Sequence, residues 1–114
     1  MALPEQYANG NMGGTFGAAM KWAGLDGLAI TGRAAEPSIL LVEPEGKCSV
    51  EPAGELWGSD TAETIAALEH RYGPDAHMAT IGRGGEMQVR FATIIASGGA
   101  VATNNVAEPG SGLG

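Results

Sequence analysis

The sequence predicts an α+β fold, with a small mixed or antiparallel sheet and two short helices in one 114-residue unit. Short apolar runs bounded by turn residues predict the strands, and two stretches with helical spacing predict the helices. Nineteen residues are glycine, more than twice the typical share of ~7%. They fall between apolar runs, which indicates tight turns, and no repeat of fixed period divides the chain.

The first predicted helix has about ten residues and follows Gly14. Apolar residues recur there at helical spacing: Phe16, Ala19, Met20 and Ala23. Gly24 is placed to end the helix, because glycine readily adopts the left-handed conformation that closes a last turn.

The second predicted helix covers about residues 60–72. Asp60 followed by Glu63 is typical of a capping box, in which each residue binds a free backbone N–H of the first turn. One face is apolar, with Ile65, Leu68 and Tyr72. Gly73-Pro74 then predicts the end of the helix.

Five apolar runs are predicted as strands: residues 28–30, 39–42, 48–50, 78–81 and 89–96. Glu45-Gly46 predicts a hairpin turn between the second and third runs, so the middle of the chain is expected to form a small antiparallel meander. From Ser97 onward the chain is rich in small residues and is expected to be loop-like.

Charge and cysteine content exclude several classes of function. Thirteen acidic and six basic residues give a net charge of −7, which disfavours nucleic acid and anionic membranes as partners. No apolar run approaches the ~18–20 residues of a membrane span. The single cysteine, Cys48, cannot form an internal disulfide or a cysteine-rich metal site, so we expect a cytoplasmic protein.

The best functional candidate is the glycine-rich turn at residues 11–17, before the first helix. Gly13 and Gly14 would let the backbone approach a phosphate, and the helix dipole favours negative charge there. An ordinary turn into a helix is the alternative, and it is favoured on composition alone, because neither a Walker lysine nor a GxGxxG motif is present.

Other candidates have structural alternatives. Arg83, between glycines at residues 82–86, could bind a phosphate or carboxylate, or be a solvated residue in a hairpin connection. Glu86 and Arg90 are expected to pair, without chemistry of their own. Structural or solvent-exposed roles are also expected for a larger set: His70 and His77 outside any triad, Cys48 as a packed small side chain, and Glu43, Glu45, Glu51 and Glu55 on a solvated face.

Separated motifs in this order resemble the N-terminal domain of the aldehyde ferredoxin oxidoreductase family over about residues 9–114. They are Asn11, Gly13, Gly14, Gly17, Lys21, Ala23, Gly24 and Asp26, then Leu56-Trp57-Gly58, then Ile81, Gly82, Gly85, Glu86 and Val89-Arg90-Phe91-Ala92. The resemblance implies part of a sheet-rich domain that holds a tungsten or molybdenum bis-pterin cofactor. It also implies an enzyme that oxidises aldehydes to carboxylic acids with ferredoxin as electron acceptor.

The resemblance also implies site residues. Asn11, Gly13 and Gly14 would lie against a pterin phosphate, and the backbone carbonyls of Asn11 and Ala107 would bind a magnesium ion that bridges the two pterins. The family's second cradle is similar to an Ala-Gly-Arg-Gly-Gly-Leu-Gly run. Glu108-Pro109-Gly110 stands here in place of the family's arginine loop.

The family holds a [4Fe–4S] cluster with four cysteines, so this segment by itself is expected to lack oxidoreductase activity and any catalytic residue. We therefore expect a partial N-terminal domain, truncated at both ends, whose partners are the remaining domains of the same polypeptide and, for the whole enzyme, ferredoxin. A homo-oligomer is compatible with this. The alternatives are a standalone module that binds a phosphorylated ligand and an inactive truncated fragment.

Overall fold

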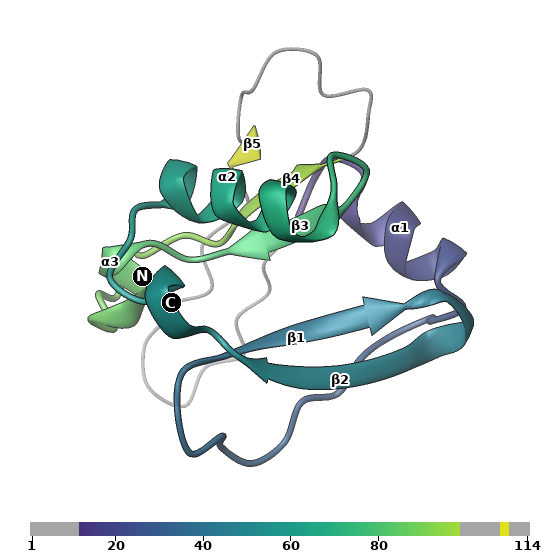
Figure 1. The fold of residues 1–114 in the computed structure, drawn as a ribbon, viewed down its shortest axis with the longest axis horizontal. Helices are drawn as coiled ribbons and strands as arrows, with labels where there is room; N and C mark the ends of the chain where they lie inside the picture. Colours follow the sequence, from purple (N-terminus) through teal and green to yellow (C-terminus); the bar gives the residue numbers. More distant parts are fainter. Residues whose placement is uncertain (1–11, 99–107, 110–114) are drawn as a thin grey trace.

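A computed structural model of the chain describes residues 12–98 and 108–109. In this part the chain forms three α-helices and two small antiparallel sheets (Figure 1), which confirms the α+β class. The elements are α1 (Phe16–Trp22), β1 (Ser38–Glu43), β2 (Lys47–Pro52), α2 (Thr61–Tyr72), β3 (His77–Thr80), α3 (Arg83–Glu86), β4 (Ile95–Gly98) and β5 (Glu108–Pro109), with 3-10 turns at Pro44–Gly46 and Gly54–Leu56.

The first sheet is the hairpin of β1 and β2, in register from Ser38 opposite Pro52 to Glu43 opposite Lys47. Its turn contains Glu45 at φ 67° and Gly46 at φ 70°, and paired positive φ values match the right-handed twist of the two strands. The predicted hairpin turn is confirmed.

The predicted meander is wrong in its first strand. Residues 28–30 are exposed and irregular, so the described sheet has two strands. Three apolar residues between Gly27 and Gly32 bury too little surface to offset the entropy lost on ordering them.

The second sheet has the order β3-β4-β5. Strand β3 confirms the run at 78–81, shifted by one residue. The run predicted at 89–96 becomes a strand only at Ile95, because α3 and Gln88 at φ 56° turn the chain first. The loop expected after Ser97 is wrong for residues 97–98, which belong to β4, and for 108–109, which form β5.

Helix α2 confirms the capping box. The Asp60 carboxylate accepts from the Glu63 N–H at 2.8 Å, and the Glu63 carboxylate accepts from the Asp60 N–H at 3.0 Å. Gly73 ends the helix at φ 96°. The predicted apolar face is also confirmed, since Leu68 is buried and Ile65 and Tyr72 are half-buried.

Helix α1 has seven residues and is shorter than predicted, but Gly24 follows it at φ 92° as expected. The Gly24 N–H donates to the carbonyl of Lys21 at 3.0 Å. The first helix therefore begins and ends at glycine-dependent turns.

The hydrophobic core of the described residues is thin. It consists of Leu68 from α2, Met78 from β3 and Ala96 from β4. Many large apolar side chains stay exposed: Met12, Trp22, Leu28, Ile30, Leu40, Val50, Trp57, Ile81, Met87 and Phe91. A surface with this many exposed apolar side chains usually contacts another protein or another part of the same polypeptide. None of the described helices is long and apolar enough to cross a membrane.

Candidate functional site

The glycine turn leads into α1 as predicted. Gly14 has φ 71°, in the left-handed region that side chains disfavour, and Thr15 is the N-cap. The first helical bond runs from the Ala19 N–H to the Thr15 carbonyl at 2.9 Å, so the N–H groups before Ala19 have no acceptor within the helix. The first turn carries no acidic side chain, which leaves its dipole free to favour an anion.

The turn is tied to the second sheet through Thr15 and His77. The Thr15 hydroxyl lies 2.9 Å from Nδ1 of His77 and makes no side-chain cap on its own helix. The ring of His77 also meets Trp22 edge to face, with centroids 6.2 Å apart. His77 therefore positions both ends of α1 against β3, in agreement with the structural role expected for it.

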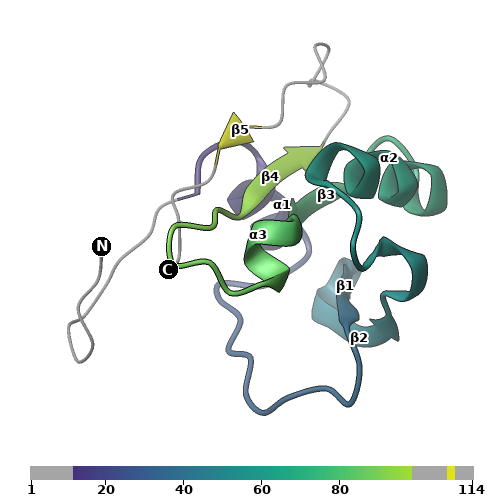
Figure 2. The same ribbon diagram turned by 90° about the vertical axis from the view of Figure 1, so that its left-hand side faces the viewer.

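The elements that follow the two segments with cofactor contacts implied by the resemblance, α1 and β5, both meet the second sheet. Helix α1 contacts β3 and β4, and β5 pairs with β4, with Ala96 opposite Glu108. Figure 2 shows β5 beside β4 and α1 behind them. Of the four predicted site residues, Gly13 and Gly14 lie in the turn, whereas Asn11 and Ala107 lie outside the described residues. Asn11 precedes the turn and Ala107 precedes β5, so both adjoin elements carried by one sheet.

A second interaction joins two of the motifs quoted above. The Gly58 N–H donates to Oε1 of Glu86 at 2.8 Å, and Nε of Arg83 donates to the Gly58 carbonyl at 2.7 Å. Both polar groups of Gly58, which has φ 89°, are thus bound by one turn of helix. We call this arrangement the Gly58 clamp.

The clamp corrects two expectations. The hairpin connection expected around Arg83 is wrong, because residues 83–86 form α3; Arg83 is exposed as expected, and its guanidinium donates to the Gly58 carbonyl. Glu86 binds Gly58 instead of Arg90. The bond to the Gly58 carbonyl uses one of the five N–H donors of Arg83, and binding of a phosphate or carboxylate by the exposed guanidinium stays a prediction. The i, i+3 spacing of Arg83 and Glu86 is the signal that could have predicted a helical turn.

Glycine is required inside the clamp. A Cβ on Gly85 would lie 2.7 Å from Cβ of Ile81, closer than side chains approach, whereas one on Gly84 would meet Ala92 at an ordinary 3.9 Å. Gly85 therefore allows close packing of α3 on Ile81, the residue that follows β3.

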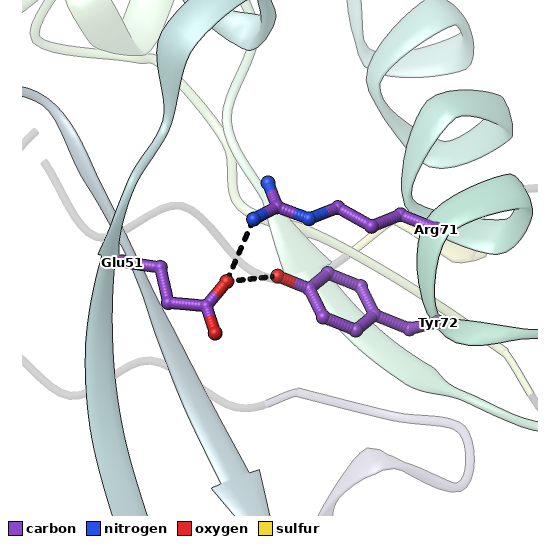
Figure 3. Close-up of polar contacts among 3 residues, drawn as sticks. All are labelled: Glu51, Arg71 and Tyr72. Carbon is purple, nitrogen blue, oxygen red and sulfur yellow. Dashed lines mark hydrogen bonds and ion pairs between the residues drawn. The ribbon is translucent and has the colours of Figure 1, made fainter.

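Glu51 joins the hairpin to α2 (Figure 3). Its Oε2 atom accepts from Arg71 at 2.8 Å and from the Tyr72 hydroxyl at 2.7 Å. Burial raises the pKa of the Tyr72 phenol, and the hydrogen bond to the Glu51 carboxylate raises this pKa further, against the lowering effect of the Arg71 charge. The solvated face expected for the acids of the hairpin is wrong for Glu51, which is half-buried and paired.

The other candidates stay without chemistry. His70 is exposed on α2, as expected. The packing predicted for Cys48 is wrong. This residue is exposed, and its Sγ lies 3.5 Å from the Gly46 carbonyl oxygen. No group of three or more metal-ligating side chains occurs among residues 12–98 and 108–109.

An open, mostly apolar groove of about 330 Å³ lies beside α3. It is lined by Ile81, Gly85, Gln88, Val89, Arg90, Ala92, Thr93 and Ile94. Met87 and Phe91, both largely exposed, belong to the same stretch of chain. The residues between α3 and β4 therefore present apolar surface outward.

Comparison with known proteins agrees with the motif order. The model of a family described as aldehyde ferredoxin oxidoreductase, N-terminal domain, matches residues 2–114. A tungsten-containing aldehyde ferredoxin oxidoreductase of Pyrococcus abyssi is 39% identical over 98 residues, which are 84% of this chain and 16% of that protein. Proteins of the same description from Thermococcus kodakarensis and Pyrococcus furiosus are 36% and 35% identical over 89 residues, 77% of this chain and 14% of theirs. No solved structure matches the chain.

Proposed function

Because this chain belongs to the aldehyde ferredoxin oxidoreductase family, we propose that it is the cofactor-binding segment of a longer oxidoreductase. In this role it would hold the phosphates of a tungsten bis-pterin while the other parts of the polypeptide complete the enzyme. The chain spans 14–16% of the length of the curated relatives described above. The substrate, an aldehyde oxidised to a carboxylic acid, and ferredoxin as electron acceptor are carried from the family to this chain as part of the proposal.

The observation that carries the proposal is that α1 and β5 both meet strand β4 of the second sheet. The turn at Gly13 and Gly14 enters α1, which contacts β4, and β4 pairs with β5 at Glu108–Pro109. Two backbone segments from opposite parts of the sequence therefore approach one sheet, as is needed for a ligand held between them. Asn11 and Ala107, directly before these segments, would offer backbone carbonyls to a magnesium ion, a hard cation that prefers oxygen ligands.

The turn itself suits a phosphate. Gly14 at φ 71° has no side chain to shield the backbone, the N–H groups before Ala19 have no acceptor within α1, and its first turn carries no acid. With a net charge of −7, the chain has few cations to bind an anion, so backbone donors carry the interaction. The bound pterin and metal would supply the redox chemistry, and the residues of this segment would position them.

The remaining requirements fall outside this segment. A [4Fe–4S] cluster needs four thiolates, and the chain has one cysteine. The three buried hydrophobic side chains among the described residues also favour a segment that packs on further domains over a standalone binding module.

The test is the cofactor content of the longer polypeptide that contains these residues. We expect tungsten and pterin in fixed ratio to protein, measured by plasma mass spectrometry and by fluorescence of the released pterin. A folded polypeptide with neither group would contradict the proposal. Molybdenum in place of tungsten would keep the pterin role and change only the metal.

A further inference from the structure

The hairpin of β1 and β2 has one apolar face that nothing in the described structure covers. Strand alternation places four uncharged side chains on this face, in two directly opposed pairs: Leu40 with Val50, and Val42 with Cys48. Val50 is 63% exposed and Leu40 is 37% exposed. Cys48 is exposed as well, and only Val42 is half-buried.

The opposite face of the hairpin is the one that meets the rest of the described fold. Glu51 on that face binds Arg71 and Tyr72 of α2, and Figure 3 shows the Glu51 side chain pointing toward this helix. The cross-strand partner of Glu51 is Ile39, and both are half-buried. The hairpin thus presents its more polar face inward and its apolar face outward, the reverse of the usual arrangement for a half-covered antiparallel sheet.

We propose that this face, Leu40, Val42, Cys48 and Val50, is the docking surface for an uncharged, apolar element of the same polypeptide that lies beyond these 114 residues. The proposal rests on the proposed function, in which the chain is a segment of a longer protein. Relatives more than five times as long, since 98 aligned residues are 16% of one of them, supply ample chain to form such a layer.

Net charge and covalent linkage both favour an element of the same polypeptide over a second copy of the chain as the occupant of this face. A second copy would bring a further net charge of −7, and like net charges disfavour association. A covalently linked element is instead present at a high effective concentration, on the order of millimolar. The face carries no charged side chain, so its partner must be apolar to avoid burying an unpaired charge.

Cys48 allows a direct test in the native longer polypeptide. The protein is treated with N-ethylmaleimide, and the labelling of Cys48 is followed over time by peptide mapping. The control is a thiol introduced by Ala66→Cys, a position exposed on α2. We expect Cys48 to react about 100-fold more slowly than the introduced thiol, because it reacts only when the covering element opens. Similar rates at the two positions would overturn the proposal.

A second variant avoids reliance on thiol chemistry. Val50→Thr keeps the side-chain shape and the β-branch, so on an exposed face it changes little. On a covered face it buries a hydroxyl, and we expect a lower melting temperature of the longer polypeptide. An unchanged melting temperature would count against the proposal. Tungsten and pterin measured on the same samples keep the two proposals separable: a cofactor-loaded protein with a reactive Cys48 retains the proposed function and loses the docking surface.

Discussion

Glu86 accepts a hydrogen bond from the backbone of Gly58, 28 residues earlier in the chain. Arg83 binds the carbonyl of the same residue, so the Gly58 clamp fixes the loop before α2 to the turn after β3. The clamp joins two motifs by which the chain resembles its family. It gives them a structural reason independent of cofactor chemistry.

Glu86→Ala should loosen this loop. It leaves the Gly58 N–H without its charged acceptor, and a lost bond of this kind costs about 1 kcal/mol, or roughly five-fold in local opening. Hydrogen exchange of a peptide that contains Gly58, in the longer polypeptide, would measure the effect. Glu86→Gln keeps an acceptor and should lose less. Equal exchange in Glu86→Ala and in the exposed control Asp75→Ala would show that the clamp contributes no stability.

Gly85→Ala should destabilise the region around α3, because its Cβ would lie 2.7 Å from Cβ of Ile81. Overpacking of this kind typically costs about 1–3 kcal/mol. Gly84→Ala is the matched control, since its nearest contact is an ordinary 3.9 Å. Thermal unfolding should show a lower midpoint for the first variant alone, and equal midpoints would contradict the packing argument.

Gly14→Ala should strain the turn before α1, since φ 71° costs a side chain about 1–2 kcal/mol. Gly17→Ala, in a helix and with open space around it, should stabilise α1 by about 0.5–1 kcal/mol. Under the proposed function, Gly14→Ala should also lower the tungsten and pterin retained by the longer polypeptide. If Gly14→Ala lowers stability but the polypeptide keeps all of its tungsten and pterin, the turn does not contribute to cofactor binding.

Tyr72 should titrate above its ordinary pKa of 10, since burial and the Glu51 carboxylate both raise the pKa. Because the folded-state pKa is the higher one, the contribution of Tyr72 to stability is complete below about pH 10. It is lost as the pH rises through the folded-state pKa. The ionisation of Tyr72 can be followed by the ultraviolet absorbance of tyrosinate in a Tyr7→Phe variant. The same titration of a protein that also carries Tyr72→Phe gives the signal of the remaining tyrosines, which is subtracted. Glu51→Gln should move this pKa downward, and no movement would contradict the interaction in Figure 3.

Local signals predicted the elements that depend on local interactions. The capping box of Asp60 and Glu63 and the turn at Glu45–Gly46 are encoded within a few residues, and both are confirmed. The strand expected at 89–96 was wrong in most of its length, because the chain turns at Gln88 (φ 56°) and the Val89 and Ala92 N–H groups donate to the carbonyls of Gly84 and Val89. Sequence spacing alone could not show this.

The candidate site also has a part that the sequence predicted and a part that only the structure shows. The glycine turn was visible as a motif, whereas the bonds of Thr15 with His77 and of Glu51 with α2 connect residues far apart in sequence. Strand β5 also needed the structure, since a strand of two residues, one of which is Pro109, leaves almost no sequence pattern. The cofactor contacts of Asn11, Gly13, Gly14 and Ala107 remain predictions.

The separation into two sheets has a consequence for the order of folding during synthesis. The hairpin pairs neighbouring stretches of chain, so it closes a short loop and can form as soon as β2 leaves the ribosome. The second sheet needs α1 from the start of the described chain and β5 from its end. Under the proposed function, a ligand held between those two segments would therefore be inserted only after residue 109 has been made, into a sheet that is among the last parts of this segment to assemble.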